Sequence, residues 1–234
     1  MIHQLIFAAP KPGMTEAEFQ KYWVEVHAVK YASKIPQIKK YMIDTRIPLP
    51  GEKGDGLFSG LAEIWLENDK ESIESLQTKE FLQGARADEP NWAAFWKTLV
   101  LEADADAHVL LKGPELAKGQ TWIKYITILK RKEGMKLADF RAYSLGKHAE
   151  LGLKIPGLLR CMQCHTRDSW YGFGEPRFDC VNMQWFDSVD ALVKAQNSAE
   201  YKKAGDDLKN FVEMKYFFPV MAAKEHWIIG PKAR

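Results

Sequence analysis

The chain has 234 residues, of which 46% are hydrophobic and 27% are charged, as is typical of a globular protein with a sizeable core. Its formal net charge is only +2 and its Lys and Arg residues are scattered, which argues against a nucleic-acid-binding protein. There is no basic and apolar leader and no run of about 18 apolar residues, so we expect a cytoplasmic protein without a membrane span.

Three cysteines, an odd number, do not make a disulfide framework and fit a reducing compartment. Cys161 and Cys164 form a Cys-x-x-Cys pair, but they lie in a predicted strand, where residues three apart point to opposite faces. No second pair of Cys or His has the spacing of a zinc site. The sequence therefore favours buried strand cysteines and predicts no metal ion.

The first half of the chain predicts the element order β-α-β-β-α-β. Residues 2–8 are rich in β-branched and aromatic residues, as strands are. Thr15 to Glu18 is a capping box that opens a helix with apolar residues at positions i, i+3, i+4 and i+7. The later predicted elements are strands at 41–45 and 58–65 around a Gly- and Pro-rich loop at 48–56, a second helix from Asn68, and a closing strand.

The second half repeats the first. Gly13 and Gly134 are 121 positions apart, as are His27 and His148, and after a slip of one residue the offset continues at 120. The matching predicted elements are strands at 122–129, 161–166 and 178–185, a loop at 169–176, a first helix carrying Leu137, Phe140 and Tyr143, and a second helix from Ser188. A repeat of this length indicates two copies of one module.

The element order predicts an α+β fold with two ferredoxin-like βαββαβ modules, at 1–116 and 117–234, joined by a linker at 112–119. In each module both helices would cover one face of an antiparallel sheet. The other face would be apolar, and its burial against the sister module predicts an intrachain dimeric α+β barrel. Such pairing allows a monomer and leaves a homodimer open.

Two segments carry a family resemblance. Residues 11–28 read Lys-Pro-Gly-Met-Thr-x-x-Glu-Phe-x-x-Tyr-Trp-x-x-x-His-Ala, and residues 58–65 read Phe-Ser-Gly-Leu-Ala-Glu-Ile-Trp. Both resemble the signature of the EthD family in the dimeric α+β barrel superfamily. The second copy is similar to a diverged member, with Ser144 in place of the usual Trp and Asn182-Met183 in place of Ala-Glu.

The resemblance implies a pocket between the sheet and its two helices, with a helix histidine nearby. It does not imply one activity, because similar barrels include lactone isomerases, polyketide cyclases, cofactor-free monooxygenases and haem enzymes. The sequence has no Gly-x-Gly-x-x-Gly in a strand-turn-helix context, no Gly-x-Ser-x-Gly and no His-Glu-x-x-His. We therefore expect no cofactor, with haem on a histidine as an alternative.

His27 and His148 are the candidate catalytic residues. His27 follows Trp23 by four positions on the helix face toward the sheet, and an imidazole titrates near neutral pH. Its place near the helix C-terminus would favour the charged form and an acid role, while capping of the last helix carbonyls is the alternative. The loss of Trp at position 144 would free space beside His148, whereas the intact motif favours the first pocket. The sequence leaves this choice open.

His165 is a third candidate, because it ends a strand below an aromatic, Gly-rich loop and could bind an oxyanion with Arg167. An edge histidine and a solvated arginine are the alternative. Candidate substrate-binding residues are Trp23, Tyr41, Arg46, Tyr143 and Arg167.

The sequence thus predicts a cofactor-independent enzyme that dehydrates, cyclises or isomerises a hydrophobic small molecule, aromatic or lactone-like, with a helix histidine as general acid or base. A haem enzyme and a non-catalytic binding protein for the same kind of molecule are the alternatives.

Overall fold

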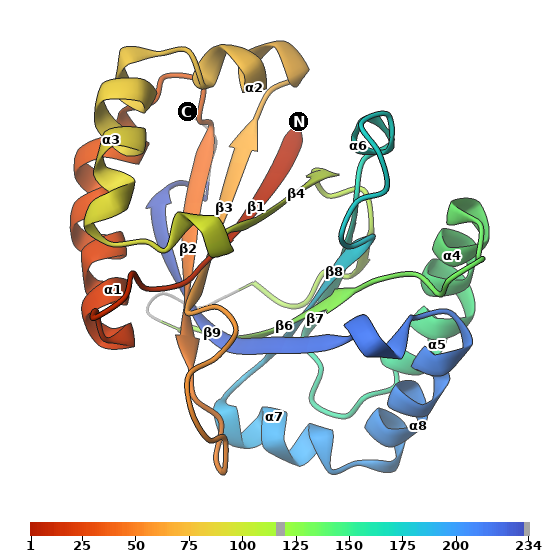
Figure 1. The fold of residues 1–234 in the computed structure, drawn as a ribbon. Coiled ribbons are helices and arrows are strands. Elements are labelled where there is room, and N and C mark those ends of the chain that lie inside the picture. Colours follow the sequence, from red (N-terminus) through yellow and green to blue (C-terminus); the bar gives the residue numbers. More distant parts are fainter. Residues whose placement is uncertain (116–119, 232–234) are drawn as a thin grey trace. The chain divides into compact units, whose positions relative to one another are not determined.

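The computed structural model describes residues 1–115 and 120–231 (Figure 1). The chain forms two compact units. Unit 1 consists of Met1–Arg46, Lys53–Ala105 and Glu225–Arg234, and unit 2 of Ile47–Glu52 and Asp106–Lys224. Residues 116–119 of the predicted linker, and with them the predicted module boundary, lie outside the described residues.

Unit 1 has an antiparallel sheet in the order β4-β1-β3-β2. Its strands are β1 (Ile2–Ala8), β2 (Lys40–Ile47), β3 (Gly60–Leu66) and β4 (Leu99–Asp104). Its helices are α1 (Glu16–Tyr22), a π-helix (Trp23–Tyr31), α2 (Asp69–Ser75), a second π-helix (Glu80–Ala85) and α3 (Arg86–Asp88), with 3₁₀ turns at Ala32–Lys34, Glu89–Asn91 and Phe95–Lys97.

Unit 2 repeats this order as β9-β6-β8-β7, with the short β5 added at the edge. Its strands are β5 (Val109–Leu111), β6 (Ile123–Leu129), β7 (Arg160–His165), β8 (Cys180–Phe186) and β9 (Phe218–Ile229). Its helices are α4 (Leu137–Tyr143), a π-helix (Ser144–His148), α5 (Ala149–Gly152), α6 (Asp168–Tyr171), α7 (Val189–Gln196) and α8 (Ala199–Asp207), with 3₁₀ turns at Leu208–Asn210 and Met214–Tyr216.

The predicted fold class, α+β with two ferredoxin-like modules, is confirmed. The helix starts are also confirmed, because the side chains of Asn68 and Ser188 each accept a hydrogen bond from the backbone three residues on. Thr15 and Glu18 form the predicted capping box. The predicted loop at 169–176 differs, since it begins with α6.

The two copies end in similar segments, at 108–111 and 226–229, and neither segment supplies the fourth strand of its own copy's sheet. The tail at 109–111 forms β5, which pairs with β7 of unit 2, while Glu225–Arg234 belongs to unit 1. The strands that occupy the fourth position are β4 in unit 1 and the first part of β9 in unit 2. The tail of the first copy therefore belongs to unit 2, and the tail of the second copy belongs to unit 1.

The sheet face of unit 1 that points away from its helices is not the apolar surface that the sequence predicts. Leu5 and Leu61 are buried there, but so are His3, Asp44 and Glu63. Nε2 of His3 lies 2.6 Å from Oε2 of Glu63, so an ionisable nitrogen lies beside the buried carboxylate. Oxygens of Asp44, Glu63 and Glu225 come within 4.8 Å of one another.

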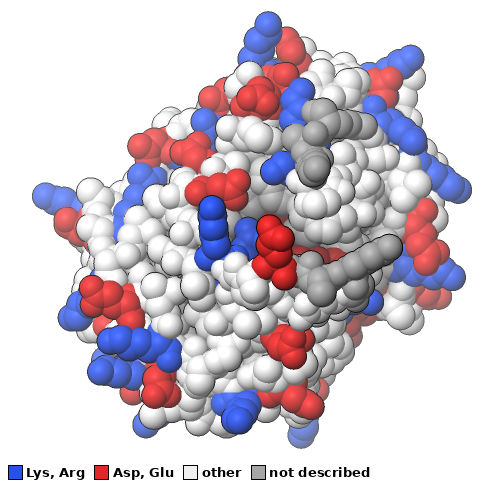
Figure 2. All heavy atoms as spheres, turned by 180° about the vertical axis from the view of Figure 1, so that it is seen from behind, with Lys and Arg blue, Asp and Glu red and all other residues white. Residues whose placement is uncertain are grey.

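On the face seen in Figure 2, Lys and Arg side chains are interspersed with Asp and Glu. Among the described helices none is long and apolar enough to cross a membrane.

The core of unit 1 is built around Trp23. Its ring packs against Phe19 and Trp92, with ring centroids 5.3 and 4.9 Å away, and it is fully buried. Position 60 must be glycine, because a Cβ there would lie 2.7 Å from the Trp23 ring. In unit 2 the same two positions hold Ser144 and Cys180, so a smaller helix residue faces a larger strand residue.

We predict that Trp23→Ser lowers the free energy of unfolding by about 3–5 kcal/mol, because it leaves a cavity that the neighbouring rings cannot fill. Urea denaturation followed by circular dichroism measures this. Ile73→Ser is the matched control at an exposed helix position and should change stability by less than about 0.5 kcal/mol. A loss below about 1 kcal/mol for Trp23→Ser would contradict the role assigned to this ring.

Candidate functional site

Unit 1 contains a buried carboxylate that is surrounded by hydrogen-bond donors. Asp88 is 4% exposed. Its Oδ2 lies 2.9 Å from Nδ1 of His27, and its Oδ1 accepts hydrogen bonds from the Tyr22 hydroxyl at 2.8 Å and the Asn91 amide at 3.0 Å. The carboxylate thus joins the first helical segment of the unit to the end of the second.

Unit 2 contains the same network. Oδ2 of Asp207 lies 3.0 Å from Nδ1 of His148. Its Oδ1 accepts hydrogen bonds from the Tyr143 hydroxyl at 2.8 Å and from the Asn210 amide at 2.9 Å. Tyr143 was predicted to bind substrate, and the structure instead places its hydroxyl on this carboxylate.

A π-helical turn brings each tyrosine and histidine onto one carboxylate. Tyr143 and His148 are five residues apart, as are Tyr22 and His27, and residues five apart in an α-helix of 3.6 residues per turn face different directions. Hydrogen bonds between residues five apart, such as Ala32 N–H to the His27 carbonyl, widen the turn and align the two side chains.

The charges of the network determine which histidine nitrogen is free to react. Burial raises the pKa of Asp207, but hydrogen bonds from Asn210, His148 and Tyr143 outweigh it and hold the pKa below its ordinary value. The carboxylate is therefore ionised near neutral pH, and Nδ1 of His148 must carry the proton that it donates to Asp207. The lone pair remains on Nε2, which has no hydrogen-bonding partner among the described residues.

Burial lowers the pKa of His148 below 6.5 and outweighs the opposing effect of Asp207. The ring is therefore neutral at pH 7, which suits a general base and not the acid role expected from the helix C-terminus. The pKa of His27 is lowered for the same reason. There Trp92 Nε1 also lies 3.1 Å from Nδ1, but the ionised Asp88 keeps the proton on that nitrogen.

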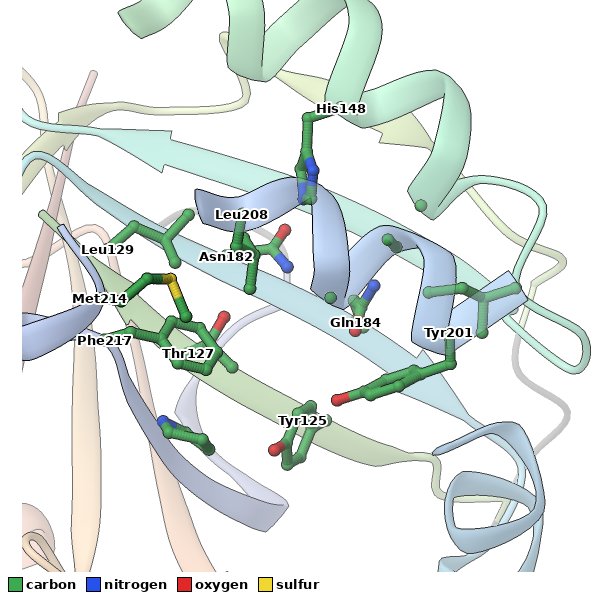
Figure 3. A pocket seen from close by; sticks show the side chains of 15 residues that line it. Tyr125, Thr127, Leu129, His148, Asn182, Gln184, Tyr201, Leu208, Met214 and Phe217 are labelled. Carbon is green, nitrogen blue, oxygen red and sulfur yellow. The ribbon is translucent and has the colours of Figure 1, made fainter. Parts of the chain in front are cut away.

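His148 lies on the wall of a cavity in unit 2 of about 280 Å³ (Figure 3). The cavity lies between β6, β8 and α8, and its floor and walls are mainly apolar. None of the residues that line it is Lys, Arg, Asp or Glu. The lining residues are Tyr125, Thr127, Leu129, His148, Gly152, Ile155, Asn182, Gln184, Tyr201, Ala204, Gly205, Leu208, Met214, Phe217 and Pro219.

The helical surroundings of the two histidines differ. The His27 ring is covered by Trp92, at a centroid distance of 4.5 Å, and by Tyr31, at 6.3 Å. His148 has Phe211 at the corresponding position, at 4.7 Å, and four residues after it stands Gly152 where the first copy has Tyr31. Loss of that second ring leaves space on the pocket side of His148.

The strand floor differs as well. In unit 1, Ile6 pairs with Ala62 on the helix-facing side of the sheet, and both are apolar. The corresponding pair in unit 2 is Thr127 with Asn182, and the next pair along is Tyr125 with Gln184. The second copy thus has polar Thr127, Asn182 and Gln184 where the first has Ile6, Ala62 and Ile64.

Ser144 does not open the pocket, contrary to the sequence-based expectation. Its hydroxyl is fully buried and donates to Oε1 of Gln163 at 2.8 Å. Gln163 and Cys180 occupy the room that a tryptophan would need, and neither lines the cavity. The space beside His148 comes instead from Gly152 and the changed strand residues.

The predicted site residues of unit 1 have structural contacts within that unit. In unit 1, Trp23 and Tyr41 are core residues, and burial raises the pKa of the Tyr41 hydroxyl. Arg46 is buried in a salt bridge of 2.7 Å with Glu16. None of these residues lines the cavity of unit 2.

His165 and Arg167 do not form the predicted oxyanion site at the cavity. Burial, with His108 and Arg141 nearby, lowers the pKa of His165 to about 3, and its Nε2 lies 3.0 Å from Oε1 of Gln163. Arg167 is half-buried at the start of α6. Neither residue lines the cavity.

Asp88, Asp207 and the residues of the cavity floor were not among the site residues predicted from the sequence. A signal for the two aspartates was present, since Asp88 and Asn91 recur as Asp207 and Asn210 at a constant offset of 119. Each copy has an Asp three residues before an Asn, and an aromatic residue follows that Asn. This repeated pattern would have pointed to the two aspartates as partners of the two helix histidines.

Fold and site together define a protein of two ferredoxin-like modules, each with a Tyr-His-Asp-Asn network and the second with a ligand-sized cavity. The EthD domain model matches residues 11–95 and 132–215, once in each copy. The chain therefore belongs to the family of EthD-domain proteins and carries the domain twice. No curated protein matches the sequence significantly.

Solved structures of similar fold share little sequence with the chain. An anthrone oxidase-like protein has a TM-score of 0.67 and 12% identity, over 97% of this chain and 91% of its own. Two proteins provisionally named monooxygenases are also similar. The one from Lactobacillus acidophilus NCFM has a TM-score of 0.52 and 12% identity, over 100% and 97% of the two chains. The one from Fusobacterium nucleatum has a TM-score of 0.55 and 9% identity, over 100% of this chain and 95% of its own. At these identities the likeness shows the fold alone.

We predict that His148 titrates with a pKa below 6.5, and that Asp207→Asn lowers it further by removing the charge that favours the imidazolium. Histidine ring resonances followed by NMR across pH 4–8 measure this, with Asp88→Asn as a control that shifts His27 and leaves His148 unchanged. Since the folded pKa lies below the unfolded one, the stabilising contribution is complete above about pH 6.5 and is lost as the pH falls. A His148 pKa above 6.5 would contradict the assignment of a neutral base.

Proposed function

We propose that the chain is a cofactor-independent enzyme in which Nε2 of His148 removes a proton from a small hydrophobic molecule bound in the cavity of unit 2. The observation that carries this proposal is a neutral histidine, oriented by a buried carboxylate, on the wall of a cavity without charged side chains. A low local dielectric strengthens the interactions between the base and its substrate.

The network gives each residue a distinct part. Asp207 holds the Nδ1–H tautomer and stabilises the imidazolium that forms when Nε2 takes the proton. Tyr143 and Asn210 fix the carboxylate and do not touch the substrate. Return of the proton to another atom gives isomerisation. Its delivery to a leaving hydroxyl gives dehydration. Attack by the new carbanion on a carbonyl of the same molecule gives cyclisation, and the alkoxide that forms takes the proton back from the imidazolium.

The cavity volume supports a ligand of one or two rings. Pockets for drug-sized ligands usually span about 300–1,000 Å³, and the cavity of about 280 Å³ lies just below that range. A porphyrin is larger than a drug-sized molecule, so the cavity does not fit haem, although a histidine held by a carboxylate is also a common metal-ligand arrangement. The reaction that we propose therefore uses side chains of the chain only.

Proton removal is tested without knowledge of the natural substrate. The probe is 2-tetralone, a neutral two-ring ketone with acidic C–H bonds next to its carbonyl, and its exchange of hydrogen for deuterium in D₂O is followed by NMR. We expect the protein to accelerate exchange above the buffer rate, and His148→Gln to reduce the acceleration by about 10²–10⁴-fold, as is usual for loss of a general base.

His27→Gln is the matched control, because it removes the same ring from the same network in unit 1. It should leave the exchange rate of the folded protein unchanged. Equal rates for wild type and His148→Gln would overturn the proposal. So would binding of 2-tetralone without any exchange, which would instead indicate a non-catalytic binding protein.

A further inference from the structure

The floor of the cavity in unit 2 carries two polar side chains at positions where the first copy has isoleucine. Gln184 is 7% exposed and Thr127 is 6% exposed. Both line the cavity, and their polar atoms are not among the fully buried ones that lack a partner, so these atoms are accessible from the cavity. A buried amide or hydroxyl without a partner is destabilising, and nearly all such groups in native proteins are hydrogen-bonded.

The fold does not require polar residues at these positions. The strand pairing of unit 1 places Ile64 where unit 2 has Gln184, and Ile6 where unit 2 has Thr127. The apolar pair packs into the core of unit 1 beside Trp23. The same sheet therefore forms with apolar side chains at both positions, and the polar ones in unit 2 need another explanation.

A third polar side chain extends the floor. Asn182 pairs with Thr127 across the strands and also lines the cavity, where the first copy has Ala62. Among the described residues, its side chain accepts one long hydrogen bond of 3.9 Å, from Cys161 Sγ to Oδ1. Figure 3 shows Thr127, Asn182 and Gln184 along the strands of the floor, with His148 projecting from the helices above.

The cavity selects against charged ligands. Its lining contains no cation to balance a carboxylate or phosphate, and His148 is neutral because burial lowers its pKa. At one side of the cavity Tyr125 and Tyr201 share a hydrogen bond, and burial raises the pKa of both hydroxyls, so they also stay neutral. Moving an unpaired charge into such a site is very unfavourable.

We infer that the cavity recognises an uncharged cyclic molecule of one or two rings through a carbonyl or hydroxyl oxygen that is hydrogen-bonded by Gln184 and Thr127. The inference deepens the proposed function, since it names the ligand class of the same site, but it depends on binding and not on proton transfer. Gln184 and Thr127 are specificity-determining residues, and the ring of the ligand fills the space left by Gly152.

Three probes with one ring framework separate the contributions to binding. They are 2-tetralone, tetralin, which lacks the oxygen, and 1,2,3,4-tetrahydronaphthalene-2-carboxylate, which is an anion. Isothermal titration calorimetry gives their dissociation constants. We expect 2-tetralone to bind about tenfold more tightly than tetralin, as one or two hydrogen bonds provide, and the anion to bind at least about 100-fold more weakly than 2-tetralone.

Gln184→Leu keeps the size of the side chain. It should weaken the binding of 2-tetralone by about tenfold, while tetralin should bind as tightly as to the wild type or more tightly. Thr127→Val, an isosteric change, should act in the same direction. The matched control is Gln77→Leu at an exposed position in unit 1, which should alter none of the constants. Circular dichroism verifies that each variant is folded.

His148→Gln separates this inference from the proposed function. If the His148→Gln variant no longer catalyses exchange but still binds 2-tetralone more tightly than tetralin, both the ligand class and the proposed proton transfer are supported. If the preference is present and exchange is absent in the wild type, the ligand class stands and the enzymatic proposal fails. Two results overturn the inference: an anion that binds as tightly as the ketone, or a preference for 2-tetralone that survives Gln184→Leu and Thr127→Val unchanged.

Discussion

A carboxylate buried between two helices must be surrounded by hydrogen-bond donors, and this requirement governs the helical layer of each module. Asp207 accepts from a tyrosine and a histidine of one helical segment and from an asparagine just after the other. It therefore fixes the two segments to each other above the sheet. Removing one donor from such a network leaves a buried charge underpaired, which is far more costly than the mean value of one hydrogen bond suggests. The histidine tautomer follows from the same contact.

The same network serves two surroundings. In unit 1, Tyr31 and Trp92 cover the His27 ring, so the network holds a closed aromatic core together. In unit 2, Gly152 replaces one of these rings, and His148 reaches a cavity. The network by itself is thus a structural device of the module. Chemistry requires in addition an accessible nitrogen, and only the residues around the network supply that.

The sequence predicted the fold well because its signals are local or repeated. The capping box at Thr15, the caps at Asn68 and Ser188, and the constant offset between copies are each visible in a single chain. The site was harder to predict. Asp207 acts on His148 only because a π-helical turn aligns residues five apart, whereas the prediction assumed an α-helix. Side-chain volume also misled it, since the space expected at Ser144 is filled by residues of the neighbouring strands.

Divergence after duplication is most informative where it is energetically unfavourable. An apolar floor like that of Ile6 and Ile64 packs at no polar cost, whereas a buried amide without a partner costs about 1–3 kcal/mol. In unit 2 the polar side chains of Gln184 and Thr127 instead line the cavity beside His148. Packing accounts for the first copy but not for these two residues. A bound ligand oxygen would accept or donate hydrogen bonds there, and the function that we propose accounts in this way for the difference between the two copies at these positions.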